Sequence, residues 1–90
     1  MNETENFEKI RQWAHGNISL IIEGLNTMDQ ALFGEKERQI YAEVFGTAHL
    51  EFVKMNQRTD YIPTVDTINY LRDKKTQLTD FIWNKTHEIY

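Results

Sequence analysis

The chain has 90 residues, no cysteine and a formal net charge of −4, from 14 acidic and 10 basic side chains. This length predicts one domain over residues 1–90 with a modest core, because so short a chain buries only about 60–65% of the surface that it exposes when unfolded. The composition excludes disulfides, thiolate metal sites and cysteine nucleophiles. It also argues against a nucleic-acid binder, which normally carries a basic stripe over the phosphates.

The sequence shows no targeting or membrane segment. Its first ten residues, MNETENFEKI, lack a basic region followed by an apolar run, so we expect no signal peptide. The longest unbroken apolar run has three residues, far below the ~20 that span a bilayer. Together with the lack of cysteine, these features favour a cytoplasmic protein.

A first amphipathic helix is predicted from about Glu3 to Asn26. Apolar residues recur there at intervals of three and four, which places their side chains on one helix face. The predicted inward stripe consists of Phe7, Ile10, Trp13/Ala14, Asn17/Ile18, Ile21, Leu25 and Met28. Two glycines lie within the predicted helix. Gly24 is on the inward stripe, where close packing against a neighbour would explain it. Gly16 faces outward, and the sequence gives no reason for a glycine there.

Asn17 is the polar residue within this stripe, and two interpretations stay open. It could be a buried amide that bonds to a neighbouring helix or to a water. It could also set the register of a dimer seam, as single buried asparagines do in coiled coils.

The periodicity lapses between residues 26 and 34. Thr27 and Gln30 have the spacing of a capping box, so a short helical turn is expected at about 28–33. Gly34 would end this turn.

The stretch from Glu35 to Asn56 is predicted to form the central helix. One face carries Tyr41, Val44, Phe45, Ala48, Phe52 and Met55. A second row about 120° away on the helix carries Ala42, Gly46, His49 and Val53. The two small residues in this row would let another backbone approach closely, so we expect neighbours on two sides of this helix.

A third helix is predicted from about Pro63, in its first turn, to His87 or the end of the chain. Its apolar stripe consists of Ile68, Leu71, Lys75, Leu78, Ile82 and Ile89. With the flanking residues, the apolar sector spans roughly 200°, about twice the minimum for a helix that rests on one surface. We therefore predict an all-α antiparallel bundle of three long helices, with the short turn at about 28–33 as a fourth element.

The histidines lack the pattern of a bundle metal site. A carboxylate-bridged site would use Glu-x-x-His pairs, but the residues three positions before the histidines are Gln12, Gly46 and Asn84. No nucleotide-binding loop or metalloprotease motif is present either. We therefore expect no metal, no cofactor and no enzymatic activity. His49 is expected to pack with one ring nitrogen bonded to the backbone; the alternative is a general base or a pH-sensitive contact.

Eleven aromatic residues exceed what a single small core is expected to enclose. Exposed apolar patches usually mark a partner site, and tryptophan and tyrosine are enriched there. The candidate partner-binding residues are Phe81, Trp83 and Tyr90, with Leu50 and Val53 as a second set.

The expected function is that of a small regulatory or inhibitory protein that binds another protein and forms a homodimer. One alternative is a DNA-associated transcription regulator, with the connection at residues 27–34 as the turn of a helix-turn-helix. The other is a small hydrolase or metal-binding protein that depends on a histidine such as His49.

Overall fold

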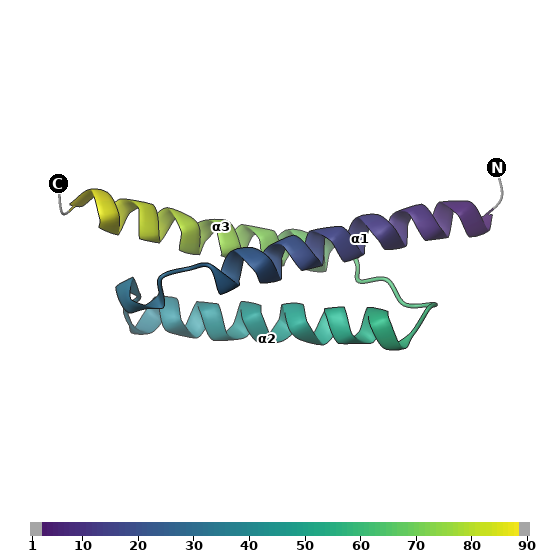
Figure 1. Ribbon diagram of the computed structural model, residues 1–90, viewed down its shortest axis with the longest axis horizontal. Coiled ribbons are helices and arrows are strands. Elements are labelled where there is room, and N and C mark those ends of the chain that lie inside the picture. Colours follow the sequence, from purple (N-terminus) through teal and green to yellow (C-terminus); the bar gives the residue numbers. More distant parts are fainter. Residues whose placement is uncertain (1–2, 89–90) are drawn as a thin grey trace.

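The computed structural model describes residues 3–88, with side chains from residue 5 onward. Three long helices, α1 (Glu3–Asn26), α2 (Glu35–Gln57) and α3 (Val65–Glu88), are joined by the short 3₁₀ turn η1 (Gln30–Leu32) and by a connection at residues 58–64. The helices run up, down and up, so that α2 is antiparallel to its two neighbours whereas α1 and α3 are parallel (Figure 1). The predicted all-α bundle of three long helices and one short turn is confirmed.

The cap of η1 differs from the predicted one. The carboxylate of Asp29 accepts a hydrogen bond from the backbone N–H of Ala31 at 3.1 Å. The Thr27 hydroxyl instead donates to the carbonyl of Gly24 at 2.9 Å and thereby closes the end of α1. The predicted capping box between Thr27 and Gln30 is therefore wrong.

Helix α3 begins two residues later than predicted. The hydroxyl oxygen of Thr64 accepts a hydrogen bond from the backbone N–H of Thr67 at 3.1 Å, which is the pattern of an N-cap residue. Pro63 is buried in the connection before the helix and does not lie in its first turn.

The core is a seam along which each helix buries residues spaced three and four apart. This spacing keeps one narrow line of each helix facing its neighbours. The buried residues are Ala14, Ile18, Ile21 and Leu25 on α1, Val44, Ala48 and Met55 on α2, Ile68, Leu71 and Leu78 on α3, and Phe33 after η1. Burying a large aliphatic side chain of this kind stabilises the fold by about 1.5–3 kcal/mol.

Helices α1 and α3 are offset along the bundle. Leu20 and Arg72 line one hollow between them, and Thr27 and Thr79 line the next. The second half of α1 therefore lies beside the first half of α3 (Figure 1). The start of α1 and the end of α3 extend beyond each other at opposite ends of the bundle (Figure 1). Figure 1 shows the two ends projecting in opposite directions, and the chain measures 55 × 22 × 19 Å.

The offset overturns part of the predicted inward stripe of α1. Ile10 is exposed because α3 does not extend far enough to cover the start of α1, and Trp13 is exposed because its neighbour Ala14 takes the buried position. Asn17 is not a buried amide bonded to another helix, since its Nδ2 donates to the carbonyl of Trp13 in the same helix at 2.8 Å. The stripe that the periodicity predicts is real, but its covered part begins at Ala14.

Three of the four residues in the second row of the central helix are not covered by the rest of the described chain. Ala42, Gly46 and Val53 are exposed, and a Cβ atom added to Gly46 would meet nothing within 4 Å. The expected second neighbour of α2 is therefore absent at Ala42, Gly46 and Val53, whereas His49 is partly buried and lines a groove with Ile22 of α1. Close packing instead occurs at Gly24, where a Cβ atom would overlap with Cε of Lys75.

The sequence analysis did not identify Glu51, which completes the buried row of α2. This carboxylate is only 8% exposed and accepts a hydrogen bond from the hydroxyl of Tyr61 in the connection to α3. The hydrogen bond, with some burial, raises the pKa of Tyr61 to about 12. The pair closes the end of the seam at a level that α3 does not reach.

We expect the Glu51–Tyr61 pair to be visible in an ultraviolet titration of the tyrosines. Tyr61 should titrate near pH 12, and Glu51→Gln should lower that pKa toward 10, because the amide keeps an acceptor but removes the negative charge. Since folding raises this pKa above its usual 10.0, the stabilisation is complete below pH 10 and is lost as the pH rises through 12. Glu8→Gln, which removes a carboxylate at an exposed position of α1, is the matched control and should leave the titration unchanged. Superimposable titrations of Glu51→Gln and the unaltered chain would contradict the assignment.

Candidate protein-binding surface

The outward side of α2 carries an uncharged row of exposed residues. This outer row consists of Gln39, Ala42, Gly46, Leu50, Val53 and Gln57, spaced three and four apart. Leu50 is 53% exposed and Val53 is 45% exposed. Because a surface helix usually presents charged side chains to solvent, α2 is unusual in having a buried seam on one side and an uncharged row on the other.

The charged residues beside the outer row are held by contacts within the chain. Glu43 accepts a hydrogen bond from the hydroxyl of Tyr70, and this bond raises the pKa of the Tyr70 phenol. On the same flank of α2, the ammonium of Lys54 lies 3.8 Å from the carboxylate of Glu51. These contacts turn charge toward α3 and the connection, which leaves the row itself uncharged.

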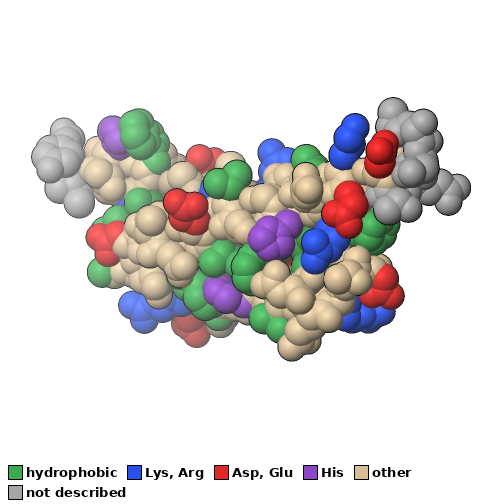
Figure 2. All heavy atoms as spheres, turned by 45° about the vertical axis from the view of Figure 1, so that its right-hand side comes forward, with side chains coloured by type: hydrophobic (Ala, Val, Ile, Leu, Met, Phe, Trp, Pro, Cys, Tyr) green, Lys and Arg blue, Asp and Glu red, His purple; other side chains and the backbone are tan. Residues whose placement is uncertain are grey.

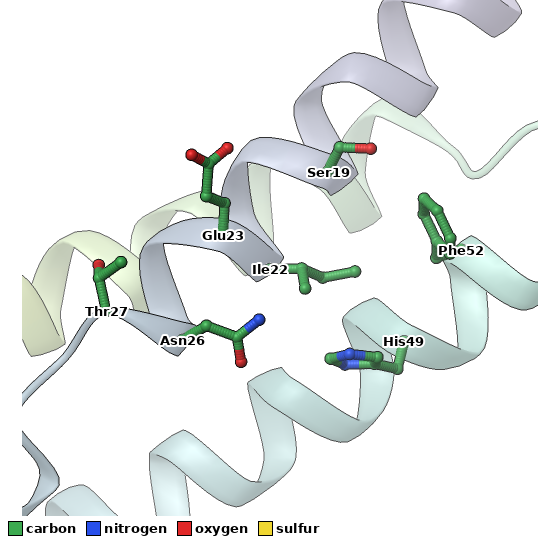
Figure 3. A pocket seen from close by; sticks show the side chains of 7 residues that line it. All are labelled: Ser19, Ile22, Glu23, Asn26, Thr27, His49 and Phe52. Carbon is green, nitrogen blue, oxygen red and sulfur yellow. The ribbon is translucent and has the colours of Figure 1, made fainter.

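A shallow groove of about 340 Å³ lies between α1 and α2, next to the outer row. Ile22 of α1 points across the groove toward Phe52 and His49 of α2 (Figure 3). The polar lining residues are Ser19, Glu23, Asn26, Thr27 and His49. Figure 2 shows one face of the molecule, with hydrophobic side chains beside two histidines near its middle. The groove thus combines an apolar floor with one carboxylate and several hydrogen-bonding groups.

His49 has the backbone hydrogen bond that the sequence predicts. Its Nδ1 lies 2.8 Å from the carbonyl oxygen of Phe45, and its ring centroid is 4.2 Å from that of Phe45. Since a carbonyl oxygen can only accept, Nδ1 carries the hydrogen and Nε2 of the neutral ring is left as an acceptor. Ser19 lines the same groove, but in Figure 3 its hydroxyl lies near Phe52 and away from His49. The arrangement offers hydrogen bonding and lacks the contact of a serine–histidine pair.

The predicted partner-binding residues do not form one cluster. Leu50 and Val53 share the outer row, whereas Trp83 is 63% exposed near the end of α3, with its ring stacked on His87 at a centroid distance of 3.9 Å. Phe81 is partly buried against the core. Tyr90 lies outside the described residues.

A second apolar surface, which the sequence analysis did not identify, lies where α1 and α3 run side by side. Trp13, Leu20 and Val65 are exposed there, and Ile10 extends the surface along α1. Trp13 and Leu20 are seven residues apart, on a line of the helix distinct from the buried Ala14 line. That separate seven-residue spacing is the signal by which the sequence could have revealed the surface. We refer to Ile10, Trp13, Leu20, Val65 and Trp83 as the α1–α3 face.

Among the described residues, no group of histidine, aspartate and glutamate side chains could hold a metal ion. None of the described helices is long and apolar enough to cross a membrane. Comparison with protein-family models, curated proteins and solved structures gave no match. Any functional proposal therefore rests on the residues of this chain.

We expect His49 to be in the Nδ1–H tautomer whenever its ring is neutral. The ¹⁵N chemical shifts of the ring should show a protonated Nδ1 and an unprotonated Nε2. His87, whose Nδ1 lies 2.8 Å from the carbonyl oxygen of Trp83, should show the same pattern and is the internal control. A protonated Nε2 with a bare Nδ1 at His49 would contradict the hydrogen bond to Phe45.

Proposed function

We propose that this protein is a non-enzymatic binding protein, a small regulator or inhibitor that docks another protein against the outer row of α2 and the adjacent groove. The observation that carries the proposal is the outer row itself, an uncharged strip from Gln39 to Gln57 that no part of the described chain covers. The inner seam and the hydrogen bonds beside it join α2 to the other two helices without using the outer row. An uncharged outer side is therefore explained better by contact with another molecule than by the stability of the single chain.

The outer row is suited to binding a helix or another regular segment of a partner protein. Ala42 and Gly46 are small and exposed, so a partner backbone can approach α2 closely at these positions. Leu50 and Val53 one to two turns later supply apolar area, whose burial contributes about 25 cal/mol per Å². Docked apolar side chains surrounded by polar groups are the usual centre of a protein interface.

The adjacent groove supports the same proposal and suggests what the partner presents. Ile22 and Phe52 can enclose an apolar side chain. Glu23 contributes a carboxylate, and Nε2 of neutral His49 contributes an acceptor. We expect the partner to insert an apolar side chain next to a hydrogen-bond donor such as lysine or arginine, since the groove offers acceptors and one negative charge.

Lysine substitutions in the outer row test whether it binds the partner. Leu50→Lys and Val53→Lys should leave the helix content and melting temperature nearly unchanged, because both side chains are largely exposed and lysine is a good helix former. Each should reduce retention of the bound protein at least about tenfold, since a charge would be buried in the contact. Retention is measured by capture from native lysate and quantitative mass spectrometry.

The matched control is Gln12→Lys, which adds the same charge to an exposed position of α1. It should retain the same proteins as the unaltered chain. The proposed surface would be wrong if Leu50→Lys and Val53→Lys retained the same proteins in the same amounts as Gln12→Lys.

A further inference from the structure

The outer row of α2 has small residues in its first half and bulky residues in its second half. Leu50 and Val53 are the exposed apolar side chains of the second half. Ala42 and Gly46 leave the first half nearly bare, and a Cβ atom added to Gly46 would meet nothing within 4 Å. A segment that packs closely on this row therefore has to present bulky residues to the first half and small residues to the second.

Read in the reverse direction, the outer row has this complementary order itself. Gly46 and Leu50 lie two residues to either side of Ala48, and Ala42 and Val53 lie six and five residues from it. When two α2 helices run antiparallel with their Ala48 residues level, Leu50 of each copy lies opposite Gly46 of the other. Val53 of each copy then lies within one residue step, about 1.5 Å, of the level of Ala42 in the other. Each bulky residue thus meets a small one.

The charges beside the row are complementary in the same arrangement. Glu43 and Lys54 lie on one flank of α2, five and six residues to either side of Ala48, and the Lys54 side chain is 42% exposed. An antiparallel pair keeps each flank on its own side, so Glu43 of each copy comes nearly level with Lys54 of the other. A carboxylate accepts at both oxygens, so Glu43 can keep its hydrogen bond to Tyr70. Opposite charges at matching levels favour this register.

The reversed order favours a second copy of this chain as the occupant of the row. A two-fold axis that lies in the plane of the contact and crosses α2 at a right angle near Ala48 reverses the helix direction. It brings the two outer rows face to face, and every contact occurs twice. A parallel pair would instead place Leu50 against Leu50 and Gly46 against Gly46, with a gap at the small residues. A different protein would need the same reversed order of small, bulky and charged residues.

We infer that two copies of the free chain pack their outer rows together as an antiparallel homodimer, with the two-fold axis near Ala48. The inference rests on the same surface as the proposed function and assigns a regulation to it. Because the second copy covers Leu50 and Val53, it has to leave before another protein docks there. The free protein is therefore a self-blocked dimer, and binding of the partner converts it to single chains.

The oligomeric state of Gly46→Leu is the most direct test. Sedimentation equilibrium of the unaltered chain at about 100 µM, above the micromolar Kd of weak specific complexes, should give twice the 10.8 kDa mass of the chain. Gly46→Leu should give the single-chain mass, because its side chain occupies the space that Leu50 of the second copy fills. At low concentration this variant should melt at a higher temperature than the unaltered chain, since the position is open and leucine is the better helix former. Loss of the dimer is thereby separated from misfolding.

Two further variants are the controls for Gly46→Leu. Exchanging the two residues, in Gly46→Leu/Leu50→Gly, should restore the dimer, because a bulky residue again lies opposite a small one. Leu20→Lys, on the α1–α3 face, should remain dimeric. A single-chain mass for the unaltered protein, or a dimer kept in Gly46→Leu, would overturn the proposal. Failure of the exchange to restore the dimer would overturn the antiparallel register.

Cross-linking tests the direction of the two helices, since the chain has no cysteine of its own. Gln39 and Gln57, at the two ends of the row, lie nine residues to either side of Ala48. With a short bis-maleimide, Gln39→Cys should cross-link in a mixture with Gln57→Cys. It should not cross-link to itself, because its two copies lie about 27 Å apart along the helices. Self-linking of Gln39→Cys without linking in the mixture would show a parallel dimer and overturn the antiparallel arrangement.

The homodimer and the proposed function can fail separately. If the unaltered chain sediments as a single copy while Leu50→Lys still loses a captured protein, the homodimer is wrong and the proposed function stands. If the dimer is lost in Gly46→Leu while Leu50→Lys and Gln12→Lys retain the same captured proteins, the homodimer stands and the docking of another protein on the outer row is wrong.

Discussion

Each long helix of this chain buries one narrow row of side chains, and the three rows meet along a single seam. Residues such as Ile18, Val44 and Leu71 are fully enclosed there, and their spacing of three and four fixes which side of each helix turns inward. The side of each helix that faces inward determines which of its residues face solvent. With Val44 and Met55 buried, the outer row of α2 must face away from the bundle, and with Ala14 buried, Trp13 lies at the edge of α1.

The seam is polar at one position, and that position reflects how far α3 extends. Where α3 is absent, the connection at residues 58–64 takes its place, and its Tyr61 packs against the core and bonds to Glu51 of α2. A carboxylate at this level can be buried because the Tyr61 hydroxyl donates to it. A buried acceptor with its donor removed would carry the full cost of desolvation. The hydrogen bond between Glu51 and Tyr61 therefore fixes the position of the connection relative to α2.

Periodicity predicted the helices well, because it depends only on neighbours in sequence. It gave α1 its observed bounds and identified Ile68, Leu71 and Leu78 as buried. It could not give the offset between α1 and α3, which depends on packing between distant residues, and so it placed Ile10 in the core. The row containing Ala42, Gly46 and Val53 was expected to pack against a neighbour but is exposed in the chain, because periodicity does not tell whether a helix face meets another part of the chain. Glu51 was missed because its partner, Tyr61, lies in an irregular segment.

The offset also gives the bundle a gradient of local stability along its length. In the middle, the second half of α1, the facing part of α2 and the first half of α3 form a three-helix cross-section (Figure 1). At each end only two long helices remain, so fewer apolar contacts oppose fraying. Segments of this kind open at lower free energy than the core and act as separate cooperative units. The two ends of the bundle should therefore open before its middle, and the exposed Trp83 lies in one of them, near the end of α3.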